Sequence, residues 1–327
     1  MLELSLACQN TDRTRALLDN RVSIEGVKIH FVTGPAEELF QRAFRHAEFD
    51  ISELSLGTHL MTTARAATHY IGVPVFLSRS FRHSAIYVRS DRGIDSPEAL
   101  KGRRIGVPDF QQTAGIWVRG MLADEYGIDS CDVRWVVGGL EQAGRAARVP
   151  YAVRPDIEIE PIAPGETLAR LLDVGEIDAV IAPKPPSCFG RNEHVRRLFP
   201  AFREAEQAWF RKTGMFPPMH TLGIRRSLVE RHPWLPVNVF AAFKKARDIA
   251  LTELQVTDTL RIMHPWITDE FNQVRALMGD DYWRYGVNES RGELDTLQRY
   301  AQNDGLIERV VPMNELFAQS TSDAFNF

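Results

Sequence analysis

The stretch Leu2-Glu3-Leu4-Ser5-Leu6-Ala7 is typical of a strand, and Val27-Lys28-Ile29-His30-Phe31-Val32 is a second strand after a helical segment. Pro35 then begins a helix over 36–44, where its missing N–H is not needed. Further strands are predicted at 49–52 and 71–78, with a helix over 57–67 between them. Strands that alternate with short helices predict an α/β fold with a mixed, mostly parallel sheet whose carboxyl edge carries the ligand loops.

A second alternating unit begins after residue 83. Its predicted strands cover 84–89, 104–107, 133–137 and 179–182, and its predicted helices cover 96–100, 113–126 and 168–172. Gly175 ends the last of these helices, because glycine accepts a left-handed cap. Residues 139–165 are rich in Gly, Pro and Arg and are expected to be irregular.

The chain then returns to the first unit. Residues 219–225 predict a return strand, and helices follow at about 236–254, 268–278 and 292–303. The pattern indicates a discontinuous lobe, 1–83 plus 222–327, and a continuous lobe, 84–221. Two crossing strands would form a hinge, with a ligand cleft between the lobes. A single doubly wound domain fits the same pattern almost as well.

Composition excludes several classes of function. The 327 residues are 44% hydrophobic and 25% charged, with a net charge of −4, so no global basic field favours nucleic acid. No apolar run approaches the roughly 20 residues that span a bilayer, and the first residues lack the pattern of a secretion signal. Three widely spaced cysteines, Cys8, Cys131 and Cys188, fit a reducing compartment. We therefore expect a cytoplasmic protein with no membrane partner. The sequence is compatible with a homo-oligomer.

Several motifs together carry a family resemblance that covers nearly the whole chain in order. Leu100-Lys101-Gly102 and the Gly175 to Ala179 segment are typical of many binding proteins. Phe81-Arg82-His83-Ser84 and the segment from Phe216 to His220 are more particular. With them the chain resembles the 4,5-dihydroxyphthalate decarboxylase family, a branch of the two-lobed type II periplasmic-binding-protein fold. The resemblance favours two lobes over one domain, and it implies an enzyme that removes one carboxylate from a dihydroxylated aromatic diacid.

The implied substrate defines the chemistry that the protein must supply. Direct loss of CO2 from the ring would leave an aryl carbanion that is too basic for neutral pH. If a hydroxyl para to the leaving group is deprotonated, electron density moves to the ring carbon, which a general acid can protonate as CO2 leaves. The reaction needs a base, an acid and a cation that binds the remaining carboxylate, and in principle no cofactor. For 4,5-dihydroxyphthalate the product would be 3,4-dihydroxybenzoate (protocatechuate).

Arg82 and His83 are the best candidate pair, because they lie where the chain leaves the first lobe. Arg82 would bind a carboxylate, and His83 would carry a proton; in a strand, both reach one ligand only if the strand bends. The alternative is an ion pair and a histidine that stabilise the hinge. His220, at the return crossing, would share acid and base work with His83. Glu53, expected after the third strand, is a candidate base or a salt-bridged surface residue.

Further binding residues are expected on loops. Thr113 is a predicted N-cap, and Gln112 and Thr113 precede N–H groups that can receive a carboxylate, although simple capping explains them too. Asn10 can donate to a hydroxyl, and Arg13 can meet an anion or merely cover the next helix. Lys184 follows a strand of the second lobe, where it adds positive charge to the cleft or sits on a stiff loop.

Two alternatives complete the set. A catechol-type ligand could recruit a metal with His83, His220 and Glu53, but no His-x-x-x-His spacing supports this, and no cofactor is expected. The chain could instead be a solute-binding protein that captures an aromatic or other small organic acid for transport or sensing. The missing secretion signal favours the enzyme.

Overall fold

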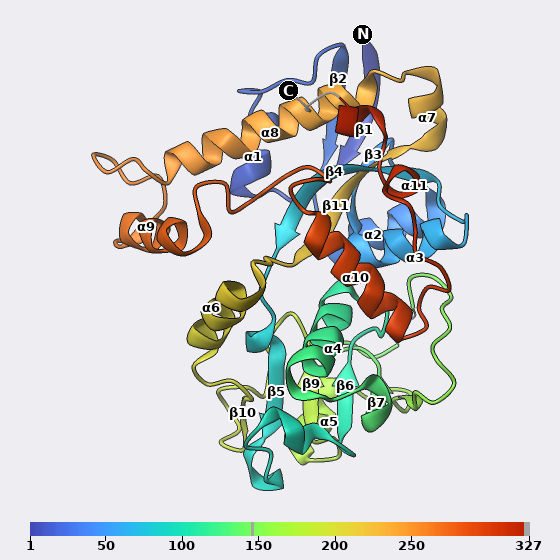
Figure 1. Cartoon of the computed structure of the whole chain (residues 1–327), viewed down its shortest axis with the longest axis vertical. Helices are drawn as coiled ribbons and strands as arrows, with labels where there is room; N and C mark the ends of the chain where they lie inside the picture. Colours follow the sequence, from blue (N-terminus) through green and yellow to red (C-terminus); the bar gives the residue numbers. More distant parts are fainter. Residues whose placement is uncertain (145–146, 324–327) are drawn as a thin grey trace. The chain divides into compact units, whose positions relative to one another are not determined.

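The computed structural model describes residues 1–144 and 147–323 (Figure 1). The chain divides into two compact units. Unit 1 comprises Met1–Arg79, Pro218–Leu294 and the C-terminal segment from Val311, and unit 2 comprises Ser80–Pro217 and Asp295–Val310.

Unit 1 contains a mixed sheet with strand order β2-β1-β3-β11-β4. β1 pairs in parallel with β2 and β3, whereas the return strand β11 lies antiparallel between β3 and β4. The strands are β1 (Leu2–Ala7), β2 (Val27–Val32), β3 (Ile51–Ser55), β4 (Tyr70–Arg79) and β11 (Pro218–Arg225). β3 begins two residues later than predicted, because the Asp50 carboxylate accepts hydrogen bonds from the backbone and hydroxyl of Ser5 and pairing with β1 begins at Ile51.

Helices cover the unit 1 sheet. α2 begins after Pro35, as predicted, and it ends where Ala47 adopts a left-handed conformation. α1 lies beside the long α8 (Figure 1). The helices are α1 (Asp12–Leu18), α2 (Ala36–His46), α3 (Leu56–Ala64), α7 (Arg226–Arg231), α8 (Leu235–Glu253), α9 (Ile267–Met278), α11 (Met313–Leu316) and α12 (Ser320–Asp323). The helix α7 was not predicted.

Unit 2 contains a second mixed sheet with strand order β10-β5-β9-β6-β7-β8. The strands are β5 (Ile86–Arg89), β6 (Arg104–Val107), β7 (Arg134–Val137), β8 (Ile159–Pro161), β9 (Ala179–Ile181) and β10 (Val195–Arg197). Its helices are η1 (His83–Ala85), η2 (Ser90–Arg92), η3 (Pro97–Leu100), α4 (Thr113–Tyr126), η4 (Ser130–Asp132), α5 (Leu168–Val174) and α6 (Phe202–Thr213). The elements β8, β10 and α6 were not predicted.

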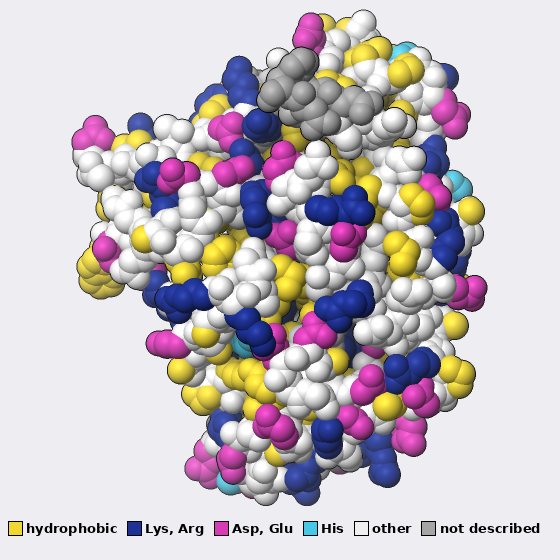
Figure 2. Space-filling view, viewed as in Figure 1, with side chains coloured by type: hydrophobic (Ala, Val, Ile, Leu, Met, Phe, Trp, Pro, Cys, Tyr) yellow, Lys and Arg dark blue, Asp and Glu magenta, His cyan; other side chains and the backbone are white. Residues whose placement is uncertain are grey.

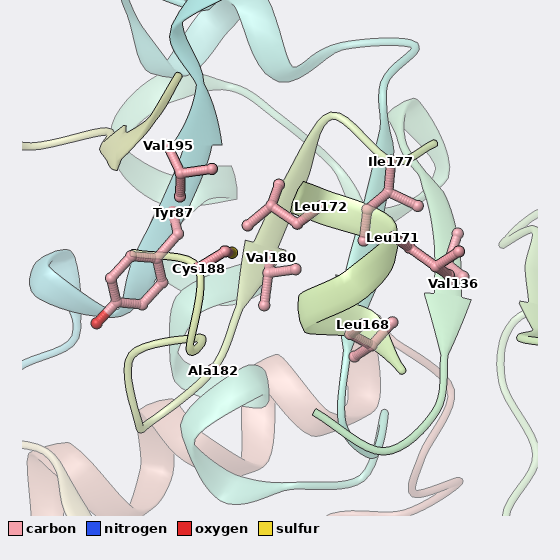
Figure 3. Packing of buried hydrophobic residues seen from close by; sticks show 10 residues of the cluster. All are labelled: Tyr87, Val136, Leu168, Leu171, Leu172, Ile177, Val180, Ala182, Cys188 and Val195. Carbon is pink, nitrogen blue, oxygen red and sulfur yellow. The ribbon is translucent and has the colours of Figure 1, made fainter. Parts of the chain in front are cut away.

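A buried cluster joins α5 to the unit 2 sheet. Leu168 and Leu172 of α5 pack with Val136, Val180 and Tyr87 from three strands (Figure 3). Gly175 ends α5 with a φ of 80°, which confirms the predicted left-handed cap.

The chain passes between the units four times, after Arg79, Pro217, Leu294 and Val310. The first passage comes directly after β4 and the second directly before β11, the antiparallel neighbour of β4. Both lie close to the predicted crossings. The other two correct the predicted boundaries, because residues 295–310 belong to unit 2 rather than to the first lobe. The helix α10 (Arg291–Asn303) begins in unit 1 and ends in unit 2.

Buried contacts explain why residues 295–310 join unit 2. Arg119 Nε donates to Asp304 at 2.8 Å, and the Ser130 hydroxyl donates to the same carboxylate at 2.6 Å. Gly120 lies so close to the Tyr300 ring that a Cβ there would stand 2.1 Å from it. The end of α10 is therefore part of the unit 2 core.

None of the helices in the described part of the chain has both the length and the apolar character that crossing a bilayer requires. On the face shown in Figure 2, acidic and basic side chains are interspersed.

Candidate active site

Glu53 and His220 form a hydrogen-bonded pair in unit 1. Both residues lie within strands. The sequence predicted Glu53 after the third strand, whereas the structure places it inside β3. In the antiparallel register Glu53 faces Leu222, which places His220 on the diagonal position of the same face. His220 Nδ1 stands 2.7 Å from Glu53 Oε1, and the Gln9 N–H donates to Oε2 at 2.9 Å. Both carboxylate oxygens of Glu53 are thus engaged.

The charge state of Glu53 follows from these contacts. Burial alone would raise the pKa of this carboxyl, but the hydrogen bond and charge of His220, the Gln9 N–H and the charge of Arg13 together hold it below its usual range. An ionised Glu53 only accepts hydrogen bonds, so His220 Nδ1 is the donor in this pair, and the other ring nitrogen, Nε2, is the one left to exchange a proton.

This pair can move a proton. A carboxylate that holds one imidazole nitrogen fixes the ring and stabilises its protonated form, as in hydrolase triads. The edge of the Phe40 ring packs on His220 with centroids 4.8 Å apart, which fixes the ring further. The His220 side chain is 20% exposed, so the proton-carrying ring is within reach of a ligand.

Asn10 and Arg13 follow closely in the chain after Gln9, whose N–H binds Glu53, but their contacts differ. Arg13 donates from Nε to the Leu77 carbonyl at 2.6 Å, pairs with Asp12, and stacks 4.5 Å over the Trp283 ring. Its charge still acts on Glu53. Asn10 is exposed after β1. Anion binding by Arg13 and hydroxyl binding by Asn10 stay predictions.

Arg82 lies in unit 2, and it is not in a strand. It is the residue before η1, and β5 begins only at Ile86, so the argument from strand alternation does not apply to Arg82 and His83. Among the described residues its guanidinium has no ion pair or hydrogen-bond partner, and Nε is buried. Burial lowers the pKa of Arg82 to about 10, and the charge of Glu206 offsets this in part. Arg82 stays charged at neutral pH.

Arg82 is partly buried, and a cation whose buried part is incompletely compensated is unfavourable unless an anion joins it. Arg82 therefore has the environment expected of a carboxylate-binding residue. A small cavity of about 10 Å³, space for about one water, adjoins it. Its lining is mostly apolar: Phe81, Arg82, His83, Trp117, Met121, Trp209 and Pro217.

His83 is buried among aromatic rings. Its ring lies 5.2 Å from that of Phe199 and 6.1 Å from that of Trp209, and its Nδ1 has no partner among the described residues. Burial lowers the pKa of His83 to about 4. The side chain is neutral at pH 7, so it can accept a proton but cannot be the acid of the free protein. His83 and His220 belong to different units, so neither unit by itself holds both of them.

The remaining predicted residues lie elsewhere in unit 2. Gln112, rather than Thr113, is the N-cap of α4, and Thr113 is the first helical residue. Both are buried, so the start of this helix is enclosed. Lys184 is exposed in the loop after β9. Among the residues the structure describes, no three His, Cys, Asp or Glu side chains gather as a metal site, so His83, His220 and Glu53 do not form the metal-ligand set that the sequence left open.

Two contributors, Gln9 and Glu206, were not predicted. Gln9 acts through its backbone N–H, which side-chain patterns do not reveal. Glu206 lies on α6, which was itself not predicted. Only the amphipathic spacing of residues 202–213 could have indicated that helix.

The fold and the proton-carrying pair define a class: an enzyme-like site on a binding-protein scaffold. The aliphatic sulphonate binding protein SsuA from Escherichia coli has a similar structure, with a TM-score of 0.54, 15% sequence identity and 99% of each chain covered. This likeness confirms the predicted two-lobed type II fold. Residues 9–147 match the family described as "ABC transporter, phosphonate, periplasmic substrate-binding protein".

Sequence relatives are more specific. The chain is 43% identical to the 4,5-dihydroxyphthalate decarboxylase of Comamonas testosteroni over 325 residues, which cover 99% of this chain and 98% of that one. It is 46% identical to the enzyme of the same name from Pseudomonas putida over 211 residues, 64% of this chain and 82% of that one. The chain belongs to the 4,5-dihydroxyphthalate decarboxylase family, which confirms the resemblance.

Proposed function

We propose that this protein converts 4,5-dihydroxyphthalate to 3,4-dihydroxybenzoate and CO2 by protonating a ring carbon. Family membership over the full chain supports the reaction. The observation that supports the route is the Glu53–His220 pair, in which a buried carboxylate holds the imidazole at 2.7 Å.

His220 is the proton donor in this proposal. Deprotonation of the hydroxyl para to the departing carboxylate moves an electron pair to the ring carbon, and the imidazolium Nε2–H protonates that carbon. The bond to the carboxyl carbon then breaks, its electron pair restores the aromatic ring and the phenolate, and CO2 leaves. The phenolate then takes back the hydroxyl proton from the base, and His220 takes a new proton from water, so one proton is consumed for each CO2 released. The carboxylate of Glu53 stabilises the imidazolium before the transfer.

Two residues of unit 2 complete the proposal. Arg82 binds the carboxylate that stays on the ring, because a planar guanidinium can donate two parallel hydrogen bonds to it. His83 is the candidate that accepts the hydroxyl proton and returns it to the phenolate; burial lowers its pKa to about 4, so it holds that proton only transiently. The roles of Asn10, Arg13, Gln112, Thr113 and Lys184 stay predictions.

The experiment is incubation with 4,5-dihydroxyphthalate, with CO2 and the aromatic product quantified against the amount of protein. Many equivalents of CO2 per chain and an equal amount of 3,4-dihydroxybenzoate support the proposal. In D2O the product should carry one deuterium on the ring carbon that lost CO2. An unchanged diacid after prolonged incubation would refute the decarboxylase.

A solute-binding protein is the second candidate, because the fold is shared with a sulphonate-binding protein. In that case one equivalent of an aromatic acid would bind without turnover. Titration calorimetry beside the CO2 assay separates the two functions.

A further inference from the structure

The carboxylate of Glu206 contacts the turn that carries Arg82 and His83. Glu206 lies on α6, and its Oε1 accepts the Ser84 N–H at 3.2 Å. The carboxylate also accepts a hydrogen bond from the His83 backbone. His83 and Ser84 are the first residues of η1, and the first N–H groups of a helix have no partner inside it. Glu206 therefore caps this turn from a distant part of the chain.

The same carboxylate is the negative charge that acts on Arg82. Glu206 is the acidic group whose charge favours the charged form of Arg82, and among the described residues no hydrogen bond or ion pair holds the guanidinium itself. Glu206 is half-buried, and burial raises the pKa of its carboxyl, with Ser84 and Arg82 acting in the opposite direction. The two charges thus balance each other in part without a direct contact.

We propose that Glu206 is a positioning residue with two separable effects: its oxygen fixes the turn before Ala85, and its charge moderates the affinity of Arg82 for a carboxylate. The inference rests on the proposed function, because it takes Arg82 as the residue that binds the substrate. A neighbouring anion that does not block the guanidinium leaves it available to the ligand while lowering the cost of burying it. It also keeps the product carboxylate from being held too tightly.

The test uses phthalate as the probe, because it carries both carboxylates but no hydroxyl and cannot follow the proposed route. Its Kd is measured by calorimetry for wild type, Glu206→Gln and Glu206→Ala, with Tm recorded for each. Gln keeps the oxygen for Ser84 and removes the charge, whereas Ala removes both. Glu204→Gln, an exposed residue of the same helix, is the matched control.

We expect Glu206→Gln to bind phthalate roughly five- to tenfold more tightly than wild type, because Arg82 loses an opposing charge. Glu206→Ala should bind roughly tenfold more weakly than Glu206→Gln, because the turn loses its cap. Glu204→Gln should match wild type.

Three results would overturn the inference. In the first, both Glu206 variants keep the wild-type Kd, whatever their Tm, so Glu206 only stabilises the fold. In the second, Glu206→Gln binds phthalate no more tightly than Glu206→Ala. In the third, wild type fails to bind phthalate. CO2 release from 4,5-dihydroxyphthalate is judged separately: a protein that binds phthalate with the expected order of Kd values and releases no CO2 refutes the proposed function alone.

Discussion

The two candidate histidines of this chain, His83 and His220, have opposite surroundings in the structure. His220 is held by the ionised Glu53, whereas His83 lies among aromatic rings, and its Nδ1 has no hydrogen-bond partner in the part of the chain that the structure describes. A carboxylate beside a histidine stabilises the charged form of the imidazole, whereas burial in an apolar cluster disfavours that form. The environment, rather than the residue type, is therefore our reason for proposing His220 as the acid.

At this scale we predict that Arg82→Lys lowers kcat/KM by at least tenfold, because a point ammonium cannot reproduce two parallel hydrogen bonds to a carboxylate. Steady-state kinetics with 4,5-dihydroxyphthalate provide the measurement. The control is Arg211→Lys, at an exposed position of α6, which should behave as wild type. Equal kinetics of the two variants would remove Arg82 from the site.

The buried histidines also predict a pH dependence of stability. The folded-state pKa of His83 is about 4, below its unfolded value of about 6.5, so its contribution is fully present above pH 6.5 and is lost as the pH falls toward 4. Between pH 7 and pH 5 the unfolded chain gains a proton that the folded chain does not, which lowers the free energy of unfolding by about 2 kcal/mol. His59, buried and with a pKa lowered by burial to about 4, adds a similar loss.

Urea unfolding at pH 7 and pH 5 checks this sign. His83→Phe should lose about 2 kcal/mol less than wild type between the two pH values, because phenylalanine does not titrate. The exposed His46→Asn should show the wild-type difference. If His83→Phe kept the full pH dependence, His83 would not be buried in its neutral form.

Local patterns were sufficient for most elements and insufficient for their connections. Runs such as residues 2–7, 27–32 and 104–107 are apolar enough to be recognised as strands, and they were found with the right bounds. α6 was missed, because it has only one fully buried side chain, Trp209, and its apolar signal is weak. The assignment of residues 295–310 was wrong, because it depends on the long-range contacts of Asp304, which no local pattern shows.

The contacts of Asp304 predict that this one side chain contributes strongly to the free energy of unfolding. Asp304→Ala leaves the buried guanidinium of Arg119 without its carboxylate and should destabilise the protein by about 3–5 kcal/mol. Asp95→Ala breaks an exposed pair with Arg196 and should cost less than about 1 kcal/mol. Denaturant unfolding of both variants tests the difference, and similar small losses would show that Asp304 does not hold residues 295–310 in unit 2.

For the whole molecule, the family motifs predicted the two-lobed architecture, which the hydrophobic periodicity alone did not decide. The alternating strands and helices were compatible with one domain or two, and only the motifs around Arg82-His83 and Met219-His220 favoured the two-lobed decarboxylase branch. They also supplied His83 and His220 as candidates. They could not show that Glu53, 167 positions from His220, is its partner, because a contact across β3 and β11 depends on strand register.

The central claim is that His220, held by Glu53, supplies the proton in decarboxylation. Its most direct test is the initial rate of CO2 release from 4,5-dihydroxyphthalate by wild type, His220→Asn and the exposed control His46→Asn, with folding verified for each. We predict many turnovers by wild type and by His46→Asn, and a rate about 10²–10⁴ lower for His220→Asn, the usual contribution of a positioned acid. A folded His220→Asn variant that releases CO2 at the wild-type rate would contradict the account.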